Sequence, residues 1–434
     1  MPKARKTRTW TKLDNAALIY PATMSTRWTA LFRLSATLTE AIDVDILETA
    51  QKRTLERIPL YASKLRRGTF WFYLEQTEDL PPVEKDVANP CVPMRFIRSD
   101  GFCLRTRYYQ NRIAVEFFHV LTDGTGGLVF LQTLVAEYLR LKYGANIPRG
   151  ERILDCSAPS LPEETEDSFV RYSGRITQSR KEVKAYHIKG QEEHNGFVHI
   201  TSGSIHAADL LAKAREKNVS ITEYLTANLI LSIDEIQRAR VRNPHHYRPV
   251  KVNVPINLRG LFPSKTLRNF ANYVNPGIDP RLGEYTFDET LSIVHHSMAM
   301  EATKKLLHTK FTTNVRSEQN LFVRLMPLFV KNIMLKAIYA QVGDALSSST
   351  LSNLGVTTLP DEMAQYVSRM DVIIGPLHVN RVSAAMLTYA GQLRISFTRT
   401  ITDPVLERVF FTRLIKQGIP VMIESNQPAE DTCR

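Results

Sequence analysis

The stretch Arg112-Ile-Ala-Val-Glu-Phe-Phe-His-Val-Leu-Thr-Asp-Gly-Thr-Gly-Gly127 contains one histidine directly after an apolar run and a glycine-rich loop directly after that histidine. Residues 112–118 alternate and are rich in β-branched and aromatic side chains, which predicts a strand. Apolar residues recur at helical spacing from Leu128 to Tyr143, and Gly144 follows as a stop signal. The motif His119-x-x-x-Asp123-Gly124 therefore lies where a strand ends and a helix begins.

His119 is the candidate general base, because the ordinary histidine pKa of about 6.5 leaves much of the side chain neutral near pH 7. A histidine packed at a strand end is the alternative. Asp123 has two interpretations of equal weight. It caps the following helix, or it holds the loop by pairing with an arginine on another element.

The 434-residue chain is longer than one hydrophobic core usually supports, which predicts two domains. Both halves mix predicted strands and helices, and residues 148–195 between them are rich in Pro, Glu, Ser, Lys and Arg. We expect an α/β protein with an N-terminal lobe (1–147), a charged crossover linker (148–195) and a C-terminal lobe (196–434).

The predicted elements follow hydrophobic periodicity and turn residues. Strands are expected at 27–38, 67–75, 94–109, 112–118, 196–205, 250–255, 370–374, 383–390 and 393–399, helices at 43–57, 128–143, 207–217, 221–238, 286–307, 321–342 and 403–416, and a Ser-rich turn at 347–355.

The charge and cysteine content restrict the partners and the compartment. The formal charge of +12 implies attraction to anions, but beyond the basic arm at 3–8 the charges are scattered, so we expect no nucleic-acid partner. Four separated cysteines without a C-x-x-C pair predict reduced thiols: Cys91, Cys103, Cys156 and Cys433. Without a signal-peptide pattern at the amino terminus, we expect a cytoplasmic protein.

The most apolar helical stretch, 321–342, is interrupted by Arg324, Lys331 and Lys336, so it does not predict a membrane-spanning helix. A long helix with one buried face is the favoured interpretation, and peripheral membrane contact is the alternative.

Several catalytic motifs are absent from the sequence: G-x-x-x-x-G-K-[ST], G-x-S-x-G and H-E-x-x-H. The adjacent pairs His245-His246 and His295-His296 point in different directions on a strand or helix, so we predict no metal site.

The motif around His119 resembles the active-site sequence shared by chloramphenicol acetyltransferase, peptide-synthetase condensation domains and related acyltransferases. The bacterial alcohol acetyltransferase-like branch is the most similar, through these further segments: Lys12-Leu-Asp-Asn-Ala-Ala-Leu-Ile-Tyr-Pro-Ala22, Phe118-His-Val-Leu-Thr-Asp-Gly-Thr-Gly-Gly127, Val254-Pro-Ile-Asn-Leu-Arg259, Leu267-Arg-Asn-Phe270 and Leu351-Ser-Asn-Leu-Gly355. Condensation domains carry a second histidine where Phe118 stands here, and the Asp-Phe-Gly-Trp-Gly element of the plant acyltransferases is absent.

This resemblance implies two chloramphenicol acetyltransferase-like lobes with a tunnel between them. His119 would deprotonate a hydroxyl acceptor, such as an alcohol, as it attacks an acyl thioester, without an acyl-enzyme intermediate. Acyl-CoA would be a co-substrate, and no cofactor would be tightly bound. An amide-forming condensation enzyme that uses carrier-protein thioesters is the alternative enzyme, and a non-catalytic anion- or membrane-binding protein is the alternative from another class.

The resemblance also implies roles for residues around the base. Asp123, next to Gly124, would pair with Arg259, or with Arg268 as second choice. Ser352 and Asn353 are candidates for stabilising the oxyanion, and a turn-forming role is the alternative. Lys265 and Arg268 are candidates for contacting the phosphates of coenzyme A, and solvated surface charges are the alternative.

Overall fold

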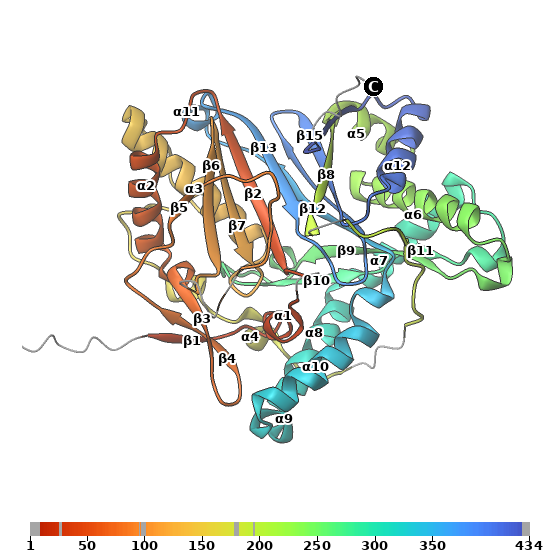
Figure 1. Ribbon diagram of the computed structural model, residues 1–434, viewed down its shortest axis with the longest axis horizontal. Helices are drawn as coiled ribbons and strands as arrows, with labels where there is room; N and C mark the ends of the chain where they lie inside the picture. The colour runs from red at the N-terminus through yellow and green to blue at the C-terminus, as the bar shows by residue number, and fades with distance from the viewer. Residues whose placement is uncertain are drawn as a thin grey trace, which may run out of the picture.

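Two β-sheets lie side by side in the computed structural model, which describes residues 9–25, 28–94, 96, 101–177, 182–193 and 196–427 (Figure 1). The N-terminal sheet has the order β13 (Val367–Ile374), β2 (Leu31–Leu38), β7 (Arg112–Phe118), β6 (Leu104–Tyr109) and β5 (Val83–Lys85). A small sheet beside it contains β1 (Trp10–Lys12), β4 (Phe72–Gln76) and β3 (Ser63–Arg67).

The C-terminal sheet has the order β10 (Ala271–Val274), β9 (Val250–Asn257), β12 (Ser349–Thr357), β14 (Val382–Tyr389), β15 (Gln392–Arg399), β8 (His199–His206) and β16 (Met422–Ser425). The short strand β11 (Gly277–Ile278) also pairs with β9. β12 runs parallel to both β9 and β14, whereas β14, β15 and β8 pair antiparallel.

Helices cover the outer faces of the two sheets (Figure 1). In the N-terminal lobe α3 packs on β2 and β7, and α2 packs on α3. α11 lies at the top of the N-terminal lobe, and the other helices lie with the C-terminal lobe or below the sheets (Figure 1). The helices are α1 (Ile19–Thr23), α2 (Val44–Arg57), α3 (Gly124–Tyr143), α4 (Ser168–Tyr172), α5 (Ala207–Glu216), α6 (Ile221–Arg240), α7 (Phe287–Glu301), α8 (Lys304–Gln319), α9 (Leu321–Leu325), α10 (Leu328–Val342), α11 (Asp361–Ala364) and α12 (Val405–Lys416).

Each large sheet has its own hydrophobic core. Phe117, Phe130 and Leu134 belong to the N-terminal core, and Ile230 and Phe397 belong to the C-terminal one. The predicted mixed α/β class is confirmed, because both lobes combine a mixed sheet with flanking helices.

One strand crosses from the second half of the chain into the first lobe. β13 pairs antiparallel with β2 over most of its length and also packs against β14 and β15. The two sheets therefore meet along β13. The domain bounds expected from the sequence remain a prediction. They assign β13 to the C-terminal lobe (196–434), whereas this strand pairs in the N-terminal sheet.

Several of the expected elements are corrected by the structure. The helix expected at 286–307 is divided into α7 and α8, because Thr303 caps the start of α8. The strand expected at 67–75 is divided by the turn between β3 and β4, where the Gly68 N–H donates to the Trp71 carbonyl, and within the described residues the strand expected at 94–109 is reduced to β6. The stretch 347–355, expected as a turn, contributes most of strand β12, because Leu351 is buried in the C-terminal core and the backbone pairs with β9 and β14. The single helix expected at 321–342 is two helices, α9 and α10, separated at Met326 and Pro327. Proline lacks the backbone N–H that a continuous helix needs.

Two further expectations from the sequence concern the cysteines and a membrane-spanning helix. Cys91, Cys103 and Cys156 are free thiols, as expected, whereas Cys433, the basic arm at 3–8 and Arg27 lie outside the described residues. Within the described ranges, no helix combines the length and the apolar character that a bilayer crossing requires.

Candidate active site

His119 directly follows β7, at the end of the sheet where the N-terminal half of the chain meets residues 267–270 of the second half. Its backbone N–H donates to the Ala30 carbonyl (3.0 Å), which continues the β2–β7 pairing by one residue. The side chain is half-buried and packs against two rings, with centroids 5.1 Å away for Tyr20 and 4.7 Å away for Phe32. The imidazole is therefore held between aromatic rings without being sealed from solvent.

Asn269 fixes the orientation of this imidazole. Its Oδ1 lies 3.4 Å from Nδ1 of His119, and its Nδ2 donates to the His119 carbonyl at 2.8 Å. When Nδ1 carries the proton toward Asn269, Nε2 keeps its lone pair. Burial lowers the pKa of His119 below its ordinary value, although the Asn269 hydrogen bond and the Asp123 charge oppose this shift. The side chain is therefore suited to accept a proton at neutral pH.

Asp123 has both of the roles that the sequence left open. Its Oδ1 accepts from the backbone of Thr125 and Gly126, both at 3.1 Å, and so caps α3. Its Oδ2 accepts from the Arg259 guanidinium at 2.7 Å and from the Phe270 N–H at 2.8 Å. The structure thus brings together Asp123 and Arg259, the first-choice partner.

The segment Leu267–Phe270 lies across the histidine loop. The Leu267 carbonyl accepts from the Thr122 hydroxyl (2.6 Å) and from the Tyr61 hydroxyl (2.7 Å). Gly126 lies so close that a Cβ at its position would be 2.2 Å from the Leu267 carbonyl oxygen. This approach requires glycine, since real Cβ atoms do not approach an oxygen so closely.

Asp14 is a site residue that the sequence analysis did not single out. It is fully buried, it accepts from Nδ2 of Asn269 at 3.1 Å, and its Oδ2 lies 3.6 Å from Arg268. Burial raises the pKa of Asp14 to about 7, and the Arg268 charge lowers it only partly. Both Asp14 and Asn269 lie in segments quoted for the family resemblance, which was the available signal for finding them.

The oxyanion candidates lie on β12, near the start of α3. Leu354 packs against Gly124, since a Cβ on that glycine would be 2.4 Å from the Leu354 side chain. Ser352 pairs with Ala385 of β14, directly before the register shift between Asn353 and Val356, and its hydroxyl has no hydrogen-bond partner among the described residues. Asn353 instead donates to Thr222 (2.9 Å) and accepts from the Gly355 N–H (2.8 Å). Of the two candidates, Asn353 has its side chain engaged in hydrogen bonds within the described residues, whereas Ser352 does not.

The two candidates for phosphate contact lie in different surroundings. Arg268 is buried and donates to the carbonyls of Lys12 (2.7 Å) and Thr165 (3.3 Å). Its guanidinium is thus turned into the protein. Lys265 is exposed and lies 3.4 Å from Glu163. Among the described residues, neither the Arg268 side chain nor the Lys265 side chain contacts His119.

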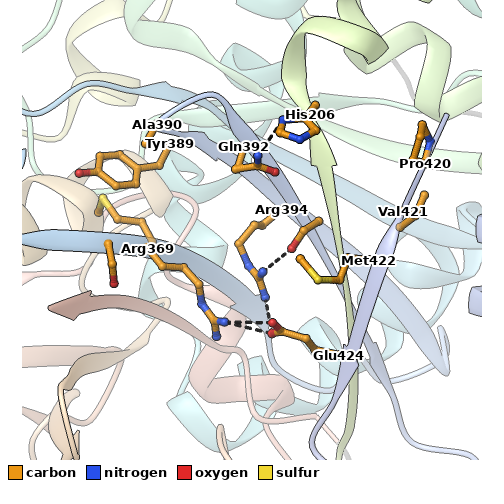
Figure 2. Close-up of a pocket in the computed structure, with 13 residues that line it drawn as sticks. His206, Arg369, Tyr389, Ala390, Gln392, Arg394, Pro420, Val421, Met422 and Glu424 are labelled. Carbon is orange, nitrogen blue, oxygen red and sulfur yellow. Dashed lines mark hydrogen bonds and ion pairs between the residues drawn. The ribbon is translucent and has the colours of Figure 1, made fainter. Parts of the chain in front are cut away.

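A cavity of about 590 Å³ lies between β13 and the β8–β15–β16 part of the C-terminal sheet. Figure 2 shows both of its arginines, Arg369 and Arg394, paired with Glu424. Arg394 also donates to the Asp371 carboxylate. No site residue predicted from the sequence lines it. In the described part of the chain, no three His, Cys, Asp or Glu side chains gather as a metal site.

Comparisons with known proteins identify the fold. No family model matches the sequence, and no curated protein matches it. Solved structures match nearly the whole chain. TRI101 of F. graminearum complexed with ethyl coenzyme A is 14% identical, with a TM-score of 0.62, and the match covers 97% of this chain and 100% of that one.

Two further structures match at similar levels. Polyketide synthase associated protein 5 of Mycobacterium tuberculosis is 16% identical, with a TM-score of 0.58 and coverage of 92% and 96%. The condensation domain of the Monacolin K polyketide synthase MokA is 11% identical, with a TM-score of 0.57 and coverage of 94% and 96%. The chain therefore shares the two-lobed fold of these structures, which confirms the expected chloramphenicol acetyltransferase-like and condensation-domain-like fold class.

Proposed function

We propose that this protein is an acyltransferase that moves an acyl group from a thioester, acyl-CoA, to a hydroxyl acceptor, with an alcohol as the acceptor class. The orientation of His119 carries this proposal. Oδ1 of Asn269 faces Nδ1 of His119, and aromatic rings flank the imidazole. The lone pair of Nε2 is therefore left for a substrate proton. The likeness to TRI101 structures that hold coenzyme A supports the choice of donor.

In the proposed reaction, Nε2 of His119 takes the proton from the acceptor hydroxyl as its oxygen attacks the thioester carbonyl carbon. The carbonyl oxygen becomes an oxyanion, for which the Ser352 hydroxyl is the candidate donor. The tetrahedral intermediate collapses by breaking the carbon–sulfur bond, and the leaving thiolate receives the proton from His119. The products are an ester and free coenzyme A, so no acyl-enzyme is needed.

Replacing His119 by Ala tests the role of the base. The variant should fold, but it should no longer release coenzyme A from acetyl-CoA in the presence of pooled alcohols, measured by chromatography. His206→Ala is the matched control, because His206 is an exposed histidine that contacts Gln392 beside the cavity of Figure 2. Unchanged turnover in His119→Ala would refute the proposal.

An amide-forming condensation enzyme is the second candidate, because condensation domains share this fold. It predicts transfer to amines on carrier proteins rather than to free alcohols. Offering both acceptor classes to the same preparation distinguishes the two reactions. A protein that transfers to neither class, yet binds anions whether or not His119 is present, would be a non-catalytic binding protein on this scaffold.

A further inference from the structure

The two helices α9 and α10 carry large apolar side chains on the outside of the molecule. Figure 1 shows them projecting below the two sheets, with α9 at the tip. Phe322 is 85% exposed, and four further large apolar residues are between 61% and 68% exposed: Leu321, Leu325, Phe329 and Ile333. We call these five residues the α9–α10 face. Large apolar side chains exposed together on two consecutive helices indicate an interaction surface.

The orientation of α10 is set by specific contacts. Lys331, on the opposite side of the helix from this face, is fully buried, and its Nζ donates to the Phe70 carbonyl at 2.8 Å. The same Nζ lies 3.2 Å from the centroid of the Trp71 ring, and the Leu328 N–H donates to the Thr69 carbonyl. The helix thus buries Lys331 and exposes Phe329, the reverse of the pattern in an ordinary surface helix. A rotation of α10 about its own axis would break the contacts of Lys331 and Leu328.

The charge around the face indicates the partner. Residues 319–343 contain three basic residues and no acidic one, and two of the basic residues, Arg324 and Lys336, are exposed. The whole chain carries +12, so a second copy would bring like charge to the same surface. A partner with an apolar interior and a negatively charged surface fits both properties. An anionic lipid bilayer has this combination.

We propose that the α9–α10 face docks on the surface of an anionic phospholipid bilayer. The apolar side chains enter the boundary between headgroups and acyl chains, while Arg324 and Lys336 remain at the level of the lipid phosphates. Docking of this kind needs no helix that spans the bilayer. The inference goes beyond acyl transfer and does not depend on it, because binding is measured without turnover.

Sedimentation with vesicles tests the proposal on the full chain. The vesicles are phosphatidylcholine alone, or phosphatidylcholine with about one third phosphatidylglycerol. The test variant is Phe322→Ser/Phe329→Ser/Ile333→Ser. The matched control replaces three exposed apolar residues of the C-terminal lobe: Leu282→Ser/Ile415→Ser/Ile423→Ser. Circular dichroism establishes that each variant is folded.

The wild type and the control should bind the anionic vesicles, and added salt should weaken this binding. The test variant should bind at least about tenfold more weakly, because its three largest contacts with the lipid are removed. Arg324→Gln/Lys336→Gln leaves the apolar face in place and should also weaken binding. This second variant keeps the test decisive if the first one fails to fold.

Three results would overturn the proposal. The wild type could fail to bind the anionic vesicles, or bind neutral vesicles equally well. The variants could bind as tightly as the control. Finally, light scattering could show a wild-type dimer that the test variant converts to a monomer, in which case the occupant of the face is a second copy of the chain.

Discussion

Replacing Arg259 by Ala should destabilise the protein by releasing the histidine loop. The Arg259 guanidinium donates to Asp123 at 2.7 Å and also to the carbonyls of Thr266 (2.9 Å) and Arg268 (2.6 Å). Removing one partner of a buried ion pair costs about 3–5 kcal/mol. Asp123 would keep its three backbone donors, so we expect the lower end, about 3 kcal/mol.

The assay is urea unfolding followed by circular dichroism, together with turnover of acyl-CoA. Arg281→Ala is the control, because Arg281 is an exposed arginine that also pairs with an aspartate, Asp279. We expect little change in that variant. In the double variant Asp123→Asn/Arg259→Ala, the loss should be smaller than the sum of the single losses, because no uncompensated charge remains. Additive losses, or an Arg259→Ala variant as stable as the control, would refute the role of this pair.

Four further predictions concern the same site. Gly126→Ala should destabilise the loop by about 1–3 kcal/mol in urea unfolding, because its Cβ would meet backbone, whereas Gly150→Ala, which meets nothing within 4 Å, should not. The rate profile should rise with pH through the lowered pKa of His119, so its acid limb should lie below pH ~6.5. Asn269→Ala should move that limb lower still and reduce kcat more than it changes KM, because the hydrogen bond raises the pKa of His119. Folded Asp14 holds a proton between about pH 4 and pH 7 that the unfolded chain has lost, so wild-type stability should fall as pH rises through this window. In Asp14→Asn this part of the pH dependence should vanish, and an unchanged dependence would contradict the buried aspartate as its source.

The strand, the loop and the helix around His119 were predictable because their signals are local. Alternation over 112–118, helical spacing over 128–143 and the capping aspartate each depend on residues only a few positions apart. The mixed α/β class follows from the same periodicities. The choice of Arg259 as partner of Asp123 came from a family resemblance, since the two residues are 136 positions apart.

Only the tertiary structure decided which distant groups meet. Asn269 contacts His119 across 150 positions and Asp14 across 255, and no periodicity encodes such contacts. The strand β13 joins the N-terminal sheet for the same reason, because pairing partners are chosen by packing rather than by the local sequence. The apolar spacing of 321–342 predicts a helix, but it determines neither the break before α10 nor which side of α10 is covered. The contacts of Lys331 with Phe70 and Trp71 decide that the phenylalanine of α10 faces outward.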